Sequence, residues 1–394
     1  MEKTAAHLSR CKLTNRRWLP LLAAAGLGVS IAVVHAAQPD TLTSRVDALF
    51  ADYNSDSQPG CAVGVIHQGH YALAKTYGSA NLEHNIPLST QSVFRVGSVS
   101  KQFTAAAIAI LAVRGDLDLD ADVHEYLPDL RRYDYPVTIR QMLHHTSGMG
   151  EYEGTNAYEL TPGKNFRFGN EDYWTIEEFY QRVRQQPLAL RPGERFEYSN
   201  IAYFLLSQVV EAVSGKTLRQ FADAELFGPL DMRASFFNDN VNAIVPHRAD
   251  GYAVLEDGSF EIFMTNLDWV GDGGVYTTLD DFIKWDRAFI TGGVPGGEQV
   301  HSLMTTADPL TIATMARDSL DMGSGYGFGL EVGTYKGHKA HVHGGSWVGF
   351  RAFYARLPDD GLSVVMLCNR EDALENDRYL ALLDIAMAEL LPAE

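Results

Sequence analysis

The stretch that decides the predicted fold is Val96-Gly-Ser-Val-Ser-Lys-Gln-Phe-Thr-Ala-Ala-Ala-Ile-Ala-Ile-Leu111. From Ser98 onward it lacks Gly and Pro and is rich in apolar residues, which predicts a buried helix. Ser98 is expected in the first turn, with Lys101 one turn further on the same face. An adjacent amine of lowered pKa can take the proton of a serine hydroxyl, and the helix N-terminus favours an oxyanion. The pair therefore predicts a nucleophile with its base.

The Ser-x-x-Lys spacing is weak evidence by itself, because a chain of this size contains such a match about once by chance. Ser9-Arg-Cys-Lys12 shows the same spacing near the N-terminus. Taken alone, Ser98 also fits a helix cap, and Lys101 a solvated surface charge. Other parts of the chain have to support the catalytic interpretation.

Tyr198-Ser199-Asn200 stands at the start of an apolar stretch that predicts a helix through Val213. A Tyr hydroxyl beside Lys101 can relay a proton to a leaving group, and an Asn amide can hold a substrate carbonyl or the Lys amine. A turn with an Asn cap is the structural alternative.

His343-Gly344-Gly345-Ser346 is expected where a strand ends. Two glycines let a substrate backbone approach closely, and the N–H of Ser346 could then point toward the reacting group. The structural alternative is a glycine bulge.

The flanking sequence predicts a mixed α+β fold. Apolar residues at helical spacing near the N-terminus are followed by a predicted hairpin, and the C-terminal part reads as a strand meander and a last helix. This order indicates an antiparallel sheet flanked by N- and C-terminal helices, with a mostly helical lobe inserted. The predicted segments are a helix within 41–56, strands at 61–67, 71–77, 339–343, 350–357 and 362–367, and a helix at 373–391; the α/β lobe covers about 37–95 and 286–394, and the helical lobe about 96–285. Residues 149–196, rich in aromatics, Asn and Gly, are expected to be either a substrate wall or a surface insertion.

The order of the three motifs resembles the serine β-lactamase and penicillin-binding protein superfamily. The Tyr-x-Asn middle motif resembles its class C-like branch, which includes DD-carboxypeptidases, D-aminopeptidases and related esterases. This resemblance implies a β-lactamase/transpeptidase-like fold and an acyl-enzyme on Ser98, with Lys101 and Tyr198 transferring protons. It also implies that Asn200, His343, Gly344, Gly345 and Ser346 line the substrate, and that the N–H groups of Ser98 and Ser346 form the oxyanion hole.

The third motif departs from the Lys-Thr-Gly of class C β-lactamases, because an imidazole at residue 343 replaces a permanent ammonium. We therefore expect cell-wall-type D-amino acid peptides as substrates. β-Lactam or small-ester hydrolysis is one alternative, and a non-catalytic penicillin- or peptidoglycan-binding protein is another.

No metal or diffusible cofactor is expected. His338, His341 and His343 suggest zinc, but only the latter two share a strand face and no matched Cys or acidic ligand accompanies them. Small-molecule or peptide substrates are the expected partners, and the net charge of −18 disfavours nucleic acid. The sequence does not indicate an oligomeric state.

The N-terminus predicts export. A basic segment, an apolar run from Trp18 to Val34 and the small residues that follow indicate a signal peptide over residues 1–36, which leaves a hydrolase domain at 37–394 without a membrane span. An uncleaved anchor is the alternative. We expect a periplasmic or secreted protein. Cys61 and Cys368 lie in apolar, strand-like runs and are expected as small buried side chains. An exported location would allow a disulfide between them, but two cysteines do not establish one.

Overall fold

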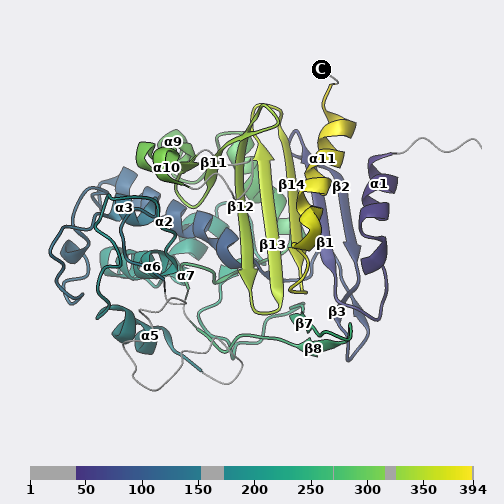
Figure 1. The fold of residues 1–394 in the computed structure, drawn as a ribbon, viewed down its shortest axis with the longest axis horizontal. Coiled ribbons are helices and arrows are strands. Elements are labelled where there is room, and N and C mark those ends of the chain that lie inside the picture. The colour runs from purple at the N-terminus through teal and green to yellow at the C-terminus, as the bar shows by residue number, and fades with distance from the viewer. Residues whose placement is uncertain (1–40, 152–172, 269, 316–324, 393–394) are drawn as a thin grey trace, which may run out of the picture. The chain divides into compact units, whose positions relative to one another are not determined.

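An antiparallel sheet built from both ends of the chain forms the centre of the molecule (Figure 1). The structure, a computed structural model, describes residues 41–151, 173–268, 270–315 and 325–392. The seven strands are arranged in the order β10-β11-β12-β13-β14-β1-β2. They are β1 (Cys61–His67), β2 (His70–Tyr77), β10 (Gly325–Tyr326), β11 (Glu331–Tyr335), β12 (His338–Trp347), β13 (Phe350–Leu357) and β14 (Leu362–Cys368).

Helices from the two ends of the chain cover one face of this sheet. α1 (Leu42–Leu49) and α11 (Arg378–Leu390) pack on each other, and Figure 1 shows both beside the strands. Alternate residues of the strands, such as Val63 on β1 and Val364 on β14, point into this layer and are fully buried.

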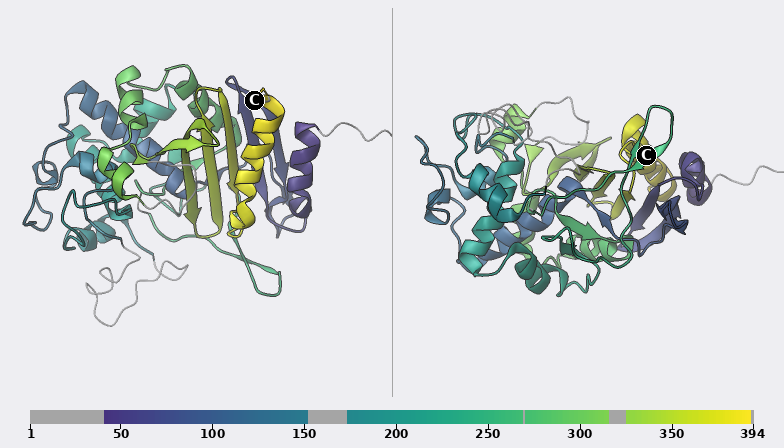
Figure 2. Two further views of the ribbon diagram at one scale, coloured as in Figure 1. Left: turned by 45° about the horizontal axis from the view of Figure 1, so that its top comes forward. Right: turned by 90° about the horizontal axis from the view of Figure 1, so that it is seen from below.

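The opposite face of the sheet packs on α8 (Leu279–Ile290) and on the turn that carries Ser98, and the other helices extend the same hydrophobic core (Figure 2). Ala62 and Val365 point into this second layer, so β1 and β14 are apolar on both faces and their sequences read as continuous hydrophobic runs. The helices on this side are α2 (Lys101–Arg114), α3 (Ile139–Leu143), α5 (Ile176–Val183), α6 (Asn200–Ser214), α7 (Leu218–Ala222), α8 (Leu279–Ile290), α9 (Glu298–Thr305) and α10 (Pro309–Thr314).

Smaller sheets connect the helices to the central sheet. One joins three short strands in the order β5-β9-β6, and β5 leads directly into the turn that carries Ser98. The strands of these sheets are β3 (Ser79–Asn81), β4 (Ile86–Pro87), β5 (Phe94–Arg95), β6 (Phe236–Phe237), β7 (Tyr252–Val254), β8 (Phe260–Ile262) and β9 (Val275–Thr277); the short 3-10 turns are η1 (Ala51–Tyr53), η2 (Gly97–Ser100), η3 (Val123–Glu125) and η6 (Glu375–Asp377), and η4 (Asp223–Phe227) is a π-helical turn.

The α+β prediction is confirmed, including the terminal helices that flank the sheet. The described residues after 40 pack as one compact unit, and its division into two lobes stays a prediction. Within the described ranges, none of the helices is long and apolar enough to cross a membrane. The predicted signal peptide at 1–36 and residues 152–172 of the expected substrate wall lie outside the described residues.

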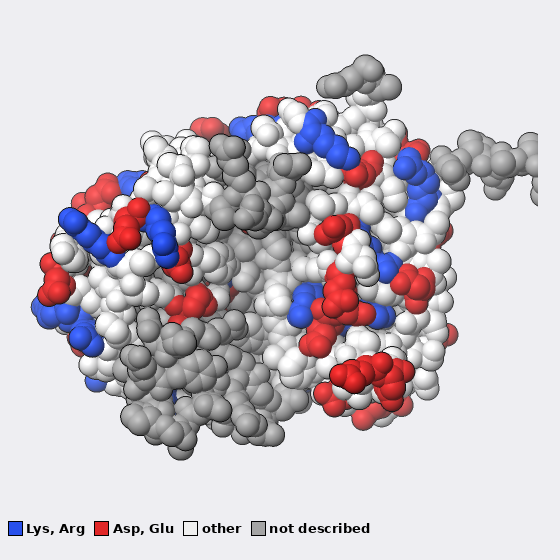
Figure 3. All heavy atoms as spheres, viewed as in Figure 1, with Lys and Arg blue, Asp and Glu red and all other residues white. Residues whose placement is uncertain are grey.

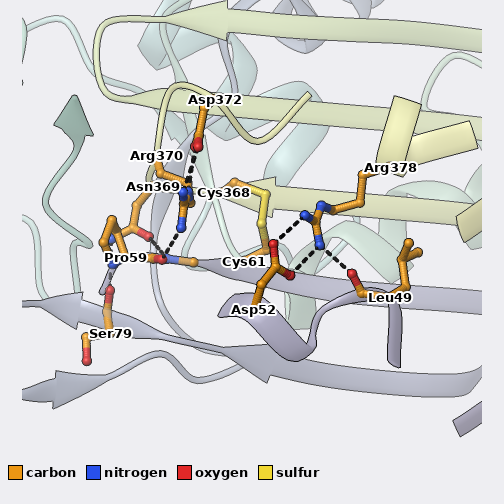
Figure 4. The surroundings of a disulfide bond; sticks show 11 residues. Leu49, Asp52, Pro59, Cys61, Ser79, Cys368, Asn369, Arg370, Asp372 and Arg378 are labelled. Carbon is orange, nitrogen blue, oxygen red and sulfur yellow. Dashed lines mark hydrogen bonds and ion pairs between the residues drawn. A yellow bond between two sulfur atoms is a disulfide. The ribbon is translucent and has the colours of Figure 1, made fainter. Parts of the chain in front are cut away.

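Cys61 and Cys368 are buried, as predicted, and they form a disulfide, which the sequence had left undecided (Figure 4). The two residues are direct partners on the neighbouring strands β1 and β14. Sequence could not show this, since 307 residues separate them and only the sheet register places them opposite each other. Asn369, next in the chain, accepts a hydrogen bond from the N–H of Gly60 at 2.8 Å and so secures the same end of the strand pair.

Candidate active site

Ser98 and Lys101 lie where a 3-10 turn becomes helix α2. The turn η2 contains Ser98, and Lys101 is the first residue of the α-helix, so the helix begins three residues later than expected. Almost all of α2 is buried, as its sequence predicts. The Nζ of Lys101 is 3.2 Å from the Oγ of Ser98. The half-buried Ser98 hydroxyl therefore has an amine within hydrogen-bond reach.

The amine of Lys101 is held by two further acceptors. Its Nζ donates to the side-chain oxygen of Asn200 at 2.6 Å and to the backbone carbonyl of Asp272 at 2.7 Å. Lys101 is fully buried, and such an amine needs partners that replace its lost hydration. Together the three contacts aim the amine at Ser98. Asp272 contributes through its backbone, which side-chain motifs do not reveal.

Tyr198 completes the group around the Ser98 hydroxyl. Ser98 acts on the Tyr198 phenol as a hydrogen-bond donor that lowers its pKa, and the Nζ of Lys101 is 4.9 Å from the centre of the Tyr198 ring. Burial raises the pKa of Tyr198 well above its usual value, and the bond to Ser98 opposes this only in part. The phenol is therefore protonated at neutral pH and can donate its proton.

His145, to which the sequence analysis assigned no role, positions Tyr198. Its Nδ1 accepts the backbone N–H of Ser199 at 3.0 Å, and its ring centre lies 4.2 Å from that of Tyr198. Its backbone carbonyl also accepts the N–H of Glu197 at 2.8 Å. Burial lowers the pKa of His145 well below its usual value, so the ring is a neutral acceptor.

Asn200 is the first residue of α6, and its amide bridges two charged groups. The side-chain oxygen accepts from Lys101, while the side-chain nitrogen donates to Oε2 of Glu151 at 2.8 Å. The backbone N–H of Asn200 donates to the other oxygen of this carboxylate. Glu151 was not among the predicted site residues. No motif marks it, because it lies 49 residues before Asn200 in the chain.

His343 lies on β12, near Tyr198, with 6.3 Å between their ring centres. Its Nδ1 is 2.6 Å from the carbonyl of Gly344, which can only accept, so Nδ1 carries the hydrogen. Its Nε2 therefore accepts from the hydroxyl of Tyr326, at 2.8 Å. Burial, and next the charge of Lys101, lower the pKa of His343 to about 4. The imidazole is thus neutral at physiological pH. Tyr326 is a further contact that the sequence analysis missed.

The glycines of the third motif allow β12 to lie against η2. A Cβ on Gly345 would lie 2.1 Å from the carbonyl oxygen of Val96, and one on Gly97 would lie 2.7 Å from the backbone nitrogen of Ser346. The Ser346 backbone is therefore beside the turn of Ser98, as an oxyanion site shared by the two residues requires. A Cβ on Gly344 would meet no described atom within 4 Å.

Charge on the surface is mainly acidic. In Figure 3, Asp and Glu side chains form several groups on the visible face, in line with the net charge of −18. Among the described residues, no three His, Cys, Asp or Glu side chains are grouped to hold a metal ion.

A family model described as Beta-lactamase matches residues 46–388. The chain belongs to the beta-lactamase family. Its relatives include a D-aminopeptidase of Gluconobacter oxydans, 27% identical over 89% of this chain and 61% of the relative. Penicillin-binding protein 4* of Bacillus subtilis is 26% identical over 85% of this chain and 74% of its own length. Esterase EstB of Burkholderia gladioli is 27% identical over 84% of this chain and 91% of its own length.

The beta-lactamase-family chain spans only about three fifths of the length of the D-aminopeptidases that it matches. Among solved structures, a penicillin-binding protein homologue from Pyrococcus abyssi has a TM-score of 0.73 at 26% identity, covering 88% of this chain and 76% of its own. A D-stereospecific amidohydrolase from Streptomyces sp. has a TM-score of 0.70 at 22% identity, covering 90% of this chain and 100% of its own. This second structure supports the fold. Family and named relatives together support a serine hydrolase.

Proposed function

We propose that this protein is a serine hydrolase that cleaves amide or ester bonds through an acyl-enzyme on Ser98. The supporting observation is the convergence of Lys101 and Tyr198 on one hydroxyl, since Lys101 Nζ is 3.2 Å from Ser98 Oγ and Ser98 acts on the Tyr198 phenol as a hydrogen-bond donor that lowers its pKa. An alcohol, an amine and a phenol in mutual contact suit acyl transfer.

In the proposed acylation, the Oγ of Ser98 bonds to the carbonyl carbon of the substrate while Lys101, in the fraction of the protein whose amine is uncharged, accepts the hydroxyl proton. The carbonyl oxygen becomes an oxyanion that the N–H groups of Ser98 and Ser346 stabilise. The bond to the leaving group then breaks, and the protonated phenol of Tyr198 donates a proton to the departing nitrogen or oxygen. Water then attacks the acyl-enzyme and gives a proton to the Tyr198 phenolate, while the Lys101 ammonium returns its proton to the departing Oγ of Ser98. The acid leaves, and all three side chains regain their starting state.

Cell-wall-type D-amino acid peptides are the proposed substrates. Relatives named D-aminopeptidase and penicillin-binding protein 4* support this class. The neutral imidazole of His343 offers no fixed positive charge to the carboxylate of a β-lactam, which disfavours β-lactam hydrolysis.

Ester hydrolysis is a second candidate. It is favoured by one observation: the chain covers 91% of esterase EstB, against 61% of the Gluconobacter oxydans D-aminopeptidase. A substrate panel of D-alanyl peptides, D-aminoacyl anilides, nitrophenyl esters and nitrocefin separates the two candidates.

The test of the mechanism is covalent labelling. A fluorophosphonate or a fluorescent penicillin should label the wild-type protein, and Ser98→Ala should remove the label because it removes the attacking oxygen. Equal labelling of wild type and Ser98→Ala, measured by gel fluorescence and peptide mass spectrometry, contradicts the proposal. Ser302→Ala, at an exposed serine of α9, is the control and should keep the label.

Export to the periplasm or medium is also part of the proposal. It is supported by the basic and apolar character of residues 1–36. The N-terminus of the protein recovered outside the cytoplasm should start near Ala37.

A further inference from the structure

Resting on the hydrolase function above, we propose that Arg95 is a positioning residue of the active site. Its side chain connects the backbone segment that holds Lys101 with the strand that carries Ser346. Both are thereby kept aligned with Ser98, which lies three residues after Arg95 in the chain.

The segment 271–273 runs alongside the start of helix α2. Its three consecutive carbonyls accept hydrogen bonds from side chains just before and within this helix. The pairs are Gly271 with the Oγ1 of Thr104 at 2.6 Å, Asp272 with the Nζ of Lys101 at 2.7 Å, and Gly273 with the Nε of Arg95 at 3.0 Å. The carbonyl that holds Lys101 therefore lies between two carbonyls that are themselves held. Its direction depends on both neighbours, because rigid peptide planes are joined at each Cα.

Arg95 holds this segment where it is closest to the nucleophile. Arg95 lies on β5, which pairs with β9 directly after the segment, and only 2% of the residue is exposed. A Cβ on Gly273 would lie 3.6 Å from the carbonyl carbon of Gly97, next to Ser98, so the segment is in van der Waals contact with the turn η2. Without the bond from Arg95, the Gly273 peptide is free to rotate, and this rotation moves the acceptor of Lys101.

Trp347 is the second contact of Arg95. The guanidinium carbon of Arg95 lies 4.6 Å from the centre of the Trp347 ring, within the range of a cation–π interaction. Trp347 is the last residue of β12 and directly follows Ser346, whose N–H is the proposed oxyanion donor. Arg95 thus links the base-holding segment to the oxyanion strand through one side chain.

The chemistry of arginine suits this link. A guanidinium is always charged and planar, so it can donate a hydrogen bond in its plane while its face stacks on an aromatic ring. A buried charge is costly unless neighbouring groups compensate for it, and the Gly273 carbonyl and the Trp347 ring both contribute to this compensation. A lysine supplies the charge and a donor but lacks the planar face.

A purely structural role of Arg95 predicts a different result from a positioning role. If Arg95 only stabilised the packing of β5, its removal would lower the melting temperature and leave the folded protein fully reactive. If it positions the site, the folded variant reacts slowly even when the reagent is bound, because the base and the oxyanion donor are displaced from Ser98.

The experiment measures the reaction of a fluorophosphonate with Ser98 over a range of reagent concentrations. This separates the maximal rate constant, kinact, from the half-saturation concentration, KI. For Arg95→Met, kinact should fall about ten- to a hundredfold while KI changes less than about threefold. For Arg95→Lys the fall in kinact should be smaller, because the charge and a donor remain.

Arg287→Met is the matched control. It removes a bond of the same kind, from an arginine on α8 to the backbone carbonyl of Gly69 at 2.9 Å, and should keep the wild-type kinact. Melting temperatures measured by circular dichroism show which variants are folded at the assay temperature.

A folded Arg95→Met with unchanged kinact, or with a change confined to KI, overturns the inference. An equal fall of kinact in Arg287→Met overturns it as well. If Arg95→Met does not fold, Arg95→Lys decides in its place, and a folded Arg95→Lys with wild-type kinact is the contradicting result. Loss of the fold in both Arg95 variants assigns the residue to stability and also overturns the positioning role.

These outcomes are distinct from failure of the hydrolase proposal. A wild-type protein that is not labelled on Ser98 refutes the acyl-enzyme mechanism. A labelled wild type whose kinact does not depend on Arg95 refutes the positioning role alone.

Discussion

Lys101 is the residue on which the proposed chemistry depends. It is fully buried, and its Nζ contacts the hydroxyl of Ser98, the amide oxygen of Asn200 and the carbonyl of Asp272. All three acceptors are uncharged: a hydroxyl, an amide oxygen and a backbone carbonyl. An amine so placed can take the Ser98 proton and return it during the reaction.

We expect Lys101→Ala to slow acylation at least about a hundredfold, because it removes the proton acceptor. The variant should still fold, since α2 keeps its apolar contacts. Stopped-flow measurement of the fluorophosphonate reaction, with circular dichroism as the folding check, tests this. An unchanged acylation rate in a folded variant would exclude Lys101 from the mechanism.

Sequence reasoning at this scale found the groups that have distinctive chemistry. Lys101 contacts Ser98 and Asn200 and lies 4.9 Å from the ring centre of Tyr198, and the catalytic roles assigned to these residues stay predictions. The supporting contacts of Glu151, His145 and Tyr326 were missed. Glu and Tyr are common residues, and what makes them part of the site is their position in space.

At the scale of elements, the contact between β12 and η2 assembles the site. The strand brings His343 and Ser346, and the turn brings Ser98. Their backbones approach so closely that a side chain at Gly345 would collide with the carbonyl of Val96, 2.1 Å from the added Cβ. The two glycines of the third motif therefore differ. Gly345 allows β12 to pack against η2, whereas a side chain at Gly344 would meet no described atom within 4 Å.

Gly345→Ala should lower the free energy of unfolding by about 1–3 kcal/mol and reduce labelling of Ser98, because β12 or η2 must move. The matched variant Gly344→Ala should keep wild-type stability. Urea unfolding and the labelling rate measure both effects. Equal stability losses in the two variants would show that the close approach of β12 to η2 is not what requires Gly345.

At the scale of the molecule, the central sheet joins the first and last parts of the chain. β1 lies between β2 and β14, and the Cys61–Cys368 disulfide links β1 to β14 on the layer packed by α1 and α11. Ser98 belongs to the other side of the sheet, where η2 contacts β12. The disulfide is thus separated from the site by the sheet.

Replacing both cysteines with Ala should lower the free energy of unfolding by about 2–4 kcal/mol, because the unfolded chain is no longer closed into a long loop. The labelling rate of Ser98 should change little below the unfolding transition. Urea unfolding of the wild type with and without a thiol reductant is the control: the reduced wild type should approach the stability of the double variant. A double variant as stable as the oxidised wild type would show that the bond contributes nothing.

The sequence alone determined the element types, the α+β class and the motif residues. These depend on local periodicity, turn residues and distinctive side chains, which are readable over short stretches. Only the tertiary structure decided that Cys61 pairs with Cys368, that Glu151 reaches Asn200, and that β12 packs on η2. Each of these depends on strand register and helix packing between residues far apart in the chain, and a shift of one residue in register would separate them.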